Sequence, residues 1–237
     1  MLLKLCCDIF KMVIDMDYYK AYDKRYKQVH DKNTLWFSFI PTLEVMDVIN
    51  KYEVSKDSKI LEVGCGEGRD AIYLLSQGYN VLGVDSSKEA IKKCNELSNY
   101  LYKDKFKEFD IINDKLAEKF DFIYSISVLS TLIDDYHRRM FLKFIKDHLT
   151  DRGYAFITVI GDGEERYSSD KDLAFDNVKK INVNTNEEMD IASTSCRIVD
   201  WDSFLKEITE CGLKVKDKWV SDRIPDFSLS MCVVVGK

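Results

Sequence analysis

Short apolar runs alternate with helical patterns through the middle of the chain. Lys59–Val63, Tyr79–Val84 and Phe120–Ile126 are apolar runs of strand length, as expected of buried parallel strands. Residues 69–77 and 88–100, which lie between these runs, carry apolar side chains at helical spacing. Strands that alternate with helices in this way predict a doubly wound α/β sheet.

Further elements extend the pattern toward both ends of the chain. We expect helices over 16–33, 41–51, 134–149 and 200–211, a turn at 151–153, and strands over 106–109, 154–160, 213–220 and 227–235. The last two strands are expected to pair antiparallel beside five parallel ones. Residues 161–194 are polar, acidic and weakly periodic, which predicts a long loop that carries function or covers a site.

Composition narrows the class of protein. A chain of 237 residues with 46% hydrophobic residues can bury one core, so we expect a single domain with embellishments. The net charge of −6 argues against a nucleic-acid partner, and no apolar run reaches the length of a membrane span. Seven scattered cysteines without a C-x-x-C pair indicate reduced thiols in a cytoplasmic protein. Residues 1–15 are expected to be a short extension, disordered or docked, before a natural start at Met16.

A glycine-rich loop and an acid carry the strongest chemical signal. Gly64, Gly66 and Gly68 follow the first strand at G-x-G-x-G spacing, and Asp85 ends the second strand. Backbone without Cβ lets a ligand come close, and a carboxylate there accepts hydrogen bonds from both hydroxyls of a ribose. The pattern predicts a nucleoside site, the alternative being glycines that serve packing alone.

Glu62 separates this loop from phosphate-binding loops. The spacing is one residue shorter than the dinucleotide fingerprint, and the Glu62 carboxylate on the preceding strand would repel a pyrophosphate. The chain also lacks the Gly-Lys-Ser/Thr of a P-loop at this position. A cationic ligand with an amino group and a sulfonium suits the loop better.

On these residues the chain resembles the class I S-adenosylmethionine (SAM) dependent methyltransferases. Residues 62–68 match the first motif of that family, and 83–87 match its acidic second-strand motif. The run G-C-G-E-G-R-D-A-I-Y-L at 64–74 resembles more closely the methyltransferases related to tellurite-resistance and thiopurine S-methyltransferase proteins. The resemblance covers residues 58 to 160 well.

The resemblance implies a fold and a division of the chain. The fold is α/β, a Rossmann-like seven-stranded mostly parallel sheet with a C-terminal antiparallel hairpin and helices on both faces. Residues 1–57 would form an N-terminal extension and helical lid, and 58–237 the methyltransferase domain. The cofactor would be SAM, with S-adenosyl-L-homocysteine as product.

The resemblance also assigns residues to the cofactor. Its methionine end would lie against Glu62, Gly64, Cys65, Gly66 and Gly68, its ribose at Asp85, its adenine at Ser86, Asp110 and the Ile111 backbone, and Ser125, Ile126 and Ser127 would line the methionine and substrate side. Ser86 or Ser87 could instead cap a helix, and Asp110 could be a surface turn acid.

Arg69 begins the helix that faces the site, where it would bind a carboxylate of cofactor or substrate. The alternative is an exposed arginine paired with Asp70 or Glu67.

An aromatic N-terminal segment is a candidate cover for the cationic methyl donor. It comprises Tyr18, Tyr19, Tyr22, Tyr26 and Trp36. Ordinary packing against the sheet is the alternative. His30 and Tyr22 are the candidate bases. Asp162, Glu164 and Glu165 could orient an amine, bind a metal or simply be solvated, and no metal site is assigned.

The acceptor is expected to be a small molecule, with a thiol or another chalcogen nucleophile as the first candidate because it needs little help from a base. Methylation of nitrogen or oxygen in a small metabolite stays open. A protein or RNA methyltransferase is disfavoured because Ser125-Ile126-Ser127-Val128 stands where amino-group nucleic-acid methyltransferases carry Asn/Asp-Pro-Pro-Tyr/Phe. A SAM-binding protein without catalysis is the remaining alternative.

Overall fold

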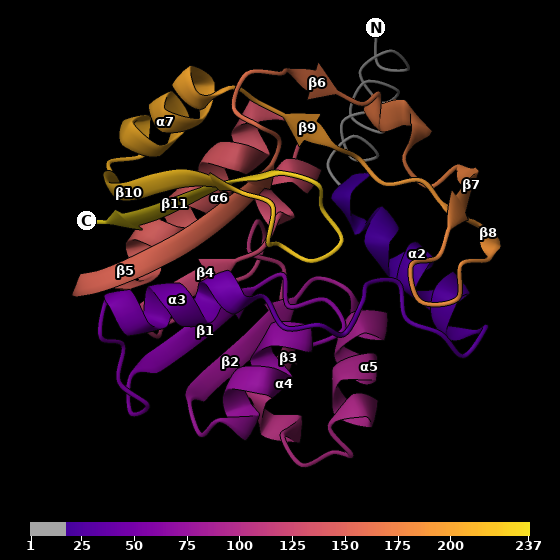
Figure 1. Ribbon diagram of the computed structural model, residues 1–237, viewed down its shortest axis with the longest axis horizontal. Coiled ribbons are helices and arrows are strands. Elements are labelled where there is room, and N and C mark those ends of the chain that lie inside the picture. Colours follow the sequence, from indigo (N-terminus) through magenta and orange to yellow (C-terminus); the bar gives the residue numbers. More distant parts are fainter. Residues whose placement is uncertain (1–17) are drawn as a thin grey trace, which may run out of the picture.

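The predicted strands form one seven-stranded sheet in the computed structural model, which describes residues 18–237 (Figure 1). They are β1 (Lys59–Val63), β2 (Asn80–Asp85), β3 (Phe106–Glu108), β4 (Phe120–Ser125), β5 (Leu149–Ile160), β10 (Lys214–Ser221) and β11 (Ser230–Gly236). Their order is β10-β11-β5-β4-β1-β2-β3, with β11 antiparallel to both neighbours and the strands from β5 to β3 parallel. The expected fold class is confirmed. The expectation of an extension before Met16 lies outside the described residues.

Helices cover both faces of the sheet, as expected (Figure 1). The α-helices are α2 (Ala21–His30), α3 (Leu43–Lys51), α4 (Arg69–Ser76), α5 (Lys88–Leu97), α6 (Asp135–His148) and α7 (Trp201–Glu210). Short 3₁₀ turns are η1 (Tyr18–Lys20), η2 (Lys103–Lys105), η3 (Val128–Thr131) and η4 (Lys171–Leu173). One hydrophobic cluster joins α3, α4 and α5 to the sheet, and another joins α6 and α7 to its other face.

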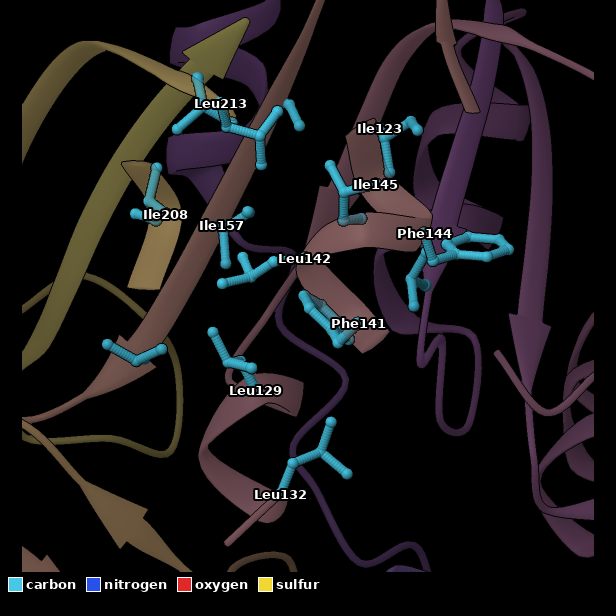
Figure 2. Packing of buried hydrophobic residues seen from close by; sticks show 14 of the residues in the cluster. Ile123, Leu129, Leu132, Phe141, Leu142, Phe144, Ile145, Ile157, Ile208 and Leu213 are labelled. Carbon is cyan, nitrogen blue, oxygen red and sulfur yellow. The ribbon is translucent and has the colours of Figure 1, made fainter. Parts of the chain in front are cut away.

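The larger cluster shows how strand alternation builds this core. Ile123 of β4 lies in the same cluster as Phe141 and Leu142 of α6 and Ile208 of α7, and all four are fully buried (Figure 2). Its neighbour Phe122 points to the opposite face and packs in the other cluster. Successive side chains of a strand point to opposite faces, so an uninterrupted apolar run supplies both layers.

Several expected element boundaries are wrong. The strand expected over 227–235 is β11 and starts at Ser230, and the helix expected over 88–100 ends at Leu97. The helix expected from Pro41 starts at Leu43, because Thr42 has extended backbone and occupies the N-cap. The turn expected at 151–153 lies within β5, where the register with β4 shifts. A Cβ at Gly153 would approach the carbonyl oxygens of Phe120 and Asp121 at 3.0 Å. This glycine therefore serves close strand approach rather than a turn.

The long loop expected over 161–194 contains regular structure. Its strands are β6 (Tyr167–Ser168), which pairs with β9 (Arg197–Ile198), and β7 (Asn177–Ile181), which pairs antiparallel with β8 (Glu188–Ala192). Met189 and Ile191 of β8 pack with Val29 of α2, and the hairpin lies beside that helix (Figure 1). The β7–β8 hairpin buries few side chains, and the helix on which it packs, α2, is far away in the sequence. The hydrophobic pattern of residues 177–192 is therefore too weak to predict the two strands.

Candidate functional site

A cavity of about 170 Å³, the main cavity, lies at the carboxyl ends of β1, β2 and β4. A smaller neighbour, the side cavity, shares some of its walls. The shared residues are Tyr26, Phe37, Gly64, Ile126 and Phe227. Because β1 stands between β2 and β4, the strand order reverses direction here. Open α/β sheets bind their ligands at such a point.

The glycine loop forms part of both cavities, and neither of the two glycines that line them tolerates a Cβ. Gly64 has φ +71°, and a Cβ there would lie 2.3 Å from Cγ2 of Val128. Gly66 has φ +54°, and its Cβ would lie 2.9 Å from the hydroxyl of Tyr26. L-residues with side chains rarely adopt this left-handed region. The loop is a cradle of bare backbone, as predicted.

Asp85 lines the main cavity and is held by backbone donors. Its carboxylate accepts the Gly66 N–H at 2.9 Å and the Ser87 N–H at 2.8 Å. Burial raises the pKa of Asp85 to about 6, although these two hydrogen bonds act against the rise. Ser87 caps α5 by accepting the Ala90 N–H. Ser86, in contrast, lines the main cavity beside Asp85.

The side cavity is lined by four charged side chains, those of Glu62, Glu67, Arg69 and Asp70. Burial raises the pKa of Glu62 well above its usual range, with repulsion from Asp70 as the next cause. Its Oε2 is buried and accepts no hydrogen bond from the described residues. Arg69 pairs with Asp226 at 3.0 Å and with Asp70 at 3.5 Å. The pair with Asp70, which was the alternative to a ligand contact, is present. The second partner, Asp226, comes from the loop between β10 and β11 and was not expected.

Asp110 lines the main cavity with Ile111, but most of its carboxylate is engaged. It accepts hydrogen bonds from the Tyr19 hydroxyl, the Asn113 amide and the Ile112 N–H, each at 2.9 Å. Burial alone would raise the pKa of Asp110, but these hydrogen bonds outweigh it and the pKa lies below its usual value. The acid is thus ionised and fixed in position.

The residues at the end of β4 differ in whether they line a cavity. Ile126 lines both cavities and Ser127 lines the main one. Ser127 has φ +59° and its N–H donates to Thr158 Oγ1 at 2.9 Å. Ser125 is fully buried, lines neither cavity and donates to the Val63 carbonyl at 2.9 Å, which joins β4 to β1. A backbone acceptor thus satisfies Ser125, which does not lie on the cavity wall where it was expected.

Four more expected residues lie off the cavity walls. Tyr18 is buried, and its hydroxyl accepts the Ile133 N–H at 2.9 Å. Trp36 packs with the Val29 cluster, under the Arg25 guanidinium at 4.7 Å. A Cβ at Gly68 would meet Cys94 Sγ at 2.9 Å, so this glycine serves helix packing. His30 donates from Nε2 to Glu67 at 2.8 Å and lines neither cavity.

Tyr22, the other candidate base, does line the main cavity. Asp162 accepts the N–H groups of Glu164 and Glu165 and so stabilises the turn after β5. Within residues 18–237 no group of three or more His, Cys, Asp or Glu is placed to hold a metal ion. In the same range no helix has both the length and the apolar character required to cross a membrane.

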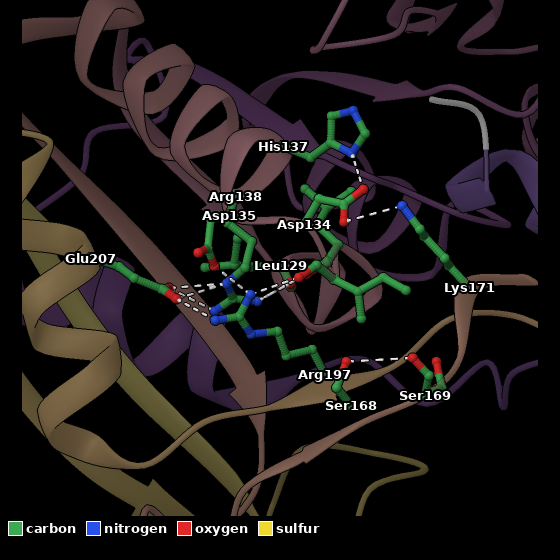
Figure 3. Close-up of polar contacts among 12 residues, drawn as sticks. Leu129, Asp134, Asp135, His137, Arg138, Ser168, Ser169, Lys171, Arg197 and Glu207 are labelled. Carbon is green, nitrogen blue, oxygen red and sulfur yellow. Dashed lines mark hydrogen bonds and ion pairs between the residues drawn. The ribbon is translucent and has the colours of Figure 1, made fainter. Parts of the chain in front are cut away.

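Several wall residues had no sequence signal. They are Phe37, Phe109, Ile112, Val128, Ser130, Thr131, Leu132, Ile160, Thr194, Ser195, Cys196 and Phe227. Those at 128–132 belong to the segment after β4, which two arginines hold (Figure 3). Arg138 donates to the carbonyl oxygens of Leu129 and Leu132 and pairs with Glu207 at 2.7 Å. Arg197 donates to the Ile133 carbonyl at 2.6 Å.

The combined walls suit a cation with a nucleoside end. Carboxylates of Glu62, Asp85 and Asp110 face the cavities together with aromatic rings, whose faces attract positive charge. Among the described wall residues, Arg69 alone carries a cationic side chain, and it is paired with acids. A hydrogen bond with Cys94, then burial, raises the pKa of Cys65 well above its usual value. Cys65 is thus a neutral thiol rather than a nucleophile.

Comparison with known families agrees with this geometry. The family described as Tellurite resistance protein TehB matches residues 28–187, more than half of the chain. The chain belongs to the TehB family. The resemblance inferred from the glycine loop and Asp85 is confirmed.

Individual TehB relatives and solved structures extend the comparison. The probable S-adenosyl-L-methionine-dependent methyltransferase TehB of Haemophilus influenzae is 29% identical over 119 residues, 47% of this chain and 39% of that protein. The chain thus matches about two fifths of that relative's length. A SAM-dependent methyltransferase from Clostridium acetobutylicum superposes with a TM-score of 0.63 at 18% identity, over 98% of both chains. A TehB-like SAM-dependent methyltransferase from Corynebacterium glutamicum gives 0.57 at 21% identity, over 92% of this chain and 97% of the other. These likenesses show the fold.

Proposed function

We propose that this chain transfers a methyl group from SAM to a small acceptor, with a thiol or another chalcogen nucleophile as the preferred class. The observation that carries the proposal is the pair of adjoining cavities at the reversal of strand order, walled by bare glycine backbone and by Asp85 and Glu62. Membership of the TehB family supports it.

The residues present fit SAM as the bound group. Asp85 would accept the ribose hydroxyls, and Ser86 and Ile111 would flank the adenine. The unpaired Oε2 of Glu62 would accept an ammonium, which also explains why a buried acid stands there. When bound, SAM supplies an electrophilic methyl group on its sulfonium.

The task of the protein is then to position two reactants and to exclude water. Tyr22, Tyr26 and Phe37 cover the cavity from the N-terminal side, and Thr194 to Cys196 close it from the segment after β8. Residues 18–57 would act as a lid on the domain that starts at 58, in line with the proposed division of the chain.

The proposed acceptor class is supported by the part of the main-cavity wall that carries no assigned cofactor residue. That part consists of hydroxyl-bearing and apolar side chains, including Ser130, Thr194 and Leu132. Neither histidine nor lysine lies among the described wall residues, and His30 is engaged by Glu67. A nucleophile that ionises readily needs no strong base, and this favours sulfur, selenium or tellurium over an amine. Tyr22 is the remaining base candidate for nitrogen or oxygen acceptors.

Two measurements test the proposal. Calorimetry with SAM and S-adenosylhomocysteine tests the cofactor: an absence of binding to either would contradict the proposal. Competition then tests the acceptor: small thiols, amines and phenols are presented together with isotope-labelled SAM, and the methylated products are separated by mass. We expect thiol products first. If amines or phenols are methylated while thiols are untouched, the sulfur assignment is wrong, and if labelled SAM binds but no acceptor is methylated, a non-catalytic SAM-binding role replaces it.

A further inference from the structure

Glu67 stands between Gly66 and Gly68 in the glycine loop. Its side chain is buried, and its carboxylate accepts hydrogen bonds from outside that loop. It accepts His30 Nε2 at 2.8 Å, the Trp36 N–H at 2.9 Å and the Phe37 N–H at 3.1 Å. Only 3% of its side chain is exposed. Within residues 18–237 every hydrogen-bond donor to Glu67 comes from the segment 30–37.

The segment 30–37 carries Phe37 and continues directly from α2, which carries Tyr22 and Tyr26. We define these three rings as the aromatic cover of the cavities. The Tyr26 ring stacks on His30 with centroids 5.8 Å apart, and Tyr26 and Phe37 line both cavities. Fixing His30 and the Phe37 backbone therefore fixes two of the three rings.

Helix α2 is fastened a second time, at its first turn. Asp23 accepts the Ser87 hydroxyl at 2.7 Å and the Glu89 N–H at 3.2 Å. An acid beside the first N–H groups of α5 is favoured by the helix dipole. The N-terminal turn of α2 is thus tied to the residues after Asp85, and its C-terminal end to the glycine loop.

We propose that Glu67 is a positioning residue, which fastens the aromatic cover to the glycine loop and thereby sets how long SAM stays bound. A buried carboxylate is stable only while its donors stay in place. Lifting the cover removes all donors from Glu67 at once, so the cover and the loop open together. The effect on SAM rests on the proposed cofactor site, whereas the fastening itself does not.

The first test needs no ligand. In Glu67→Gln we expect amide hydrogen exchange at Trp36 and Phe37 to quicken about tenfold or more, because a neutral amide oxygen holds these N–H groups less strongly. Exchange in β4 should stay unchanged. Glu118→Gln is the matched control: Glu118 is exposed, pairs with Lys59 at 3.2 Å and lies near the opposite ends of the strands. Unchanged exchange at Trp36 and Phe37 in a folded Glu67→Gln protein would overturn the proposal.

The second test measures release of labelled SAM after a chase with unlabelled SAM. Release should quicken about tenfold in Glu67→Gln and in His30→Ala, and His30→Gln, which retains a donor, should restore part of the loss. In the double variant Glu67→Gln/His30→Ala, the change in the free-energy barrier to SAM release should be smaller than the sum of the two single changes, because both substitutions remove the same contact. Faster exchange with unchanged release overturns the link to residence time. A wild-type protein that binds no SAM contradicts the proposed function instead, while the exchange experiment still decides whether Glu67 fastens the cover.

Discussion

The carboxylate of Asp85 accepts the N–H of Gly66 at 2.9 Å, so the acid that ends β2 holds the glycine loop that follows β1. One side chain therefore serves two parts of the proposed cofactor site. It shapes the cradle and, on our assignment, accepts the ribose hydroxyls. Substitution of Asp85 should consequently cost more than the loss of a single ribose contact.

Asp85→Ala should weaken SAM binding by about 1–3 kcal/mol or more, because it leaves ribose hydroxyls and a loop N–H without an acceptor. Calorimetry measures the loss. Asp104→Ala, which removes an exposed acid, is the control and should change affinity little. An unchanged affinity in Asp85→Ala would remove the ribose assignment.

Acidification should weaken SAM binding through the same carboxylate. The pKa of Asp85 is raised to about 6 by burial, so below that pH the protonated form loses an acceptor and affinity should fall toward tenfold per pH unit. The contribution of Asp85 to the free energy of unfolding changes with pH in the opposite direction. Between the unfolded value near 4 and about 6 the unfolded chain loses this proton first, so Asp85 lowers stability as pH rises. Calorimetric titrations from pH 5 to 8 measure the first effect, and Asp85→Asn should flatten this part of the profile.

Glu62→Gln should weaken binding of SAM by about 1.5–3 kcal/mol, because the ammonium of the ligand loses a charged acceptor. The apparent melting temperature should not fall, since the substitution removes an acid whose charged form is disfavoured by burial. 5′-Methylthioadenosine, which lacks the amino-acid end, serves as the matched ligand. If its affinity drops as much as that of SAM, Glu62 does not face the amino group.

Glu207→Ala should lower the free energy of unfolding by about 2–4 kcal/mol, because it leaves the buried Arg138 guanidinium without its carboxylate. Chemical denaturation measures this difference. Glu210→Ala on the same helix is the control, since Glu210 makes only an exposed pair with Lys206 at 3.8 Å, and it should change stability by less than about 0.5 kcal/mol. Equal effects of the two would mean that the Arg138 pair stabilises nothing beyond a surface contact.

The sequence alone predicted the local geometry at positions where few other residue types could stand. Gly64 and Gly66 stand at positive φ with no room for a Cβ, and Asp85 stands at the end of a short apolar run. Such positions restrict the residue strongly, so the residue in turn predicts the geometry. A cap was expected at Ser86 or Ser87, and Ser87 is the residue that caps α5.

The sequence was insufficient where one residue type serves two environments. Trp36 and Phe37 are adjacent aromatics whose N–H groups both donate to Glu67, but only Phe37 lines a cavity, and Trp36 packs with the Val29 cluster. Ser125 and Ser127 differ in the same way. Thr194 reaches the main cavity only because β8 packs on α2, a contact between segments far apart in the chain.

The hydrogen bonds between α2 and β8 limit how acceptor preference can be exchanged between relatives. Arg25 donates to the Ala192 carbonyl at 2.8 Å, and the Ala192 N–H donates to Gln28 at 2.7 Å. The segment that follows Ala192 forms the wall that we assign to the acceptor, and α2, which anchors it, lies near the start of the described chain. A chimera that grafts only one of these segments from another enzyme separates a wall from its anchor. Recombination of substrate range in this architecture therefore requires both segments to move together.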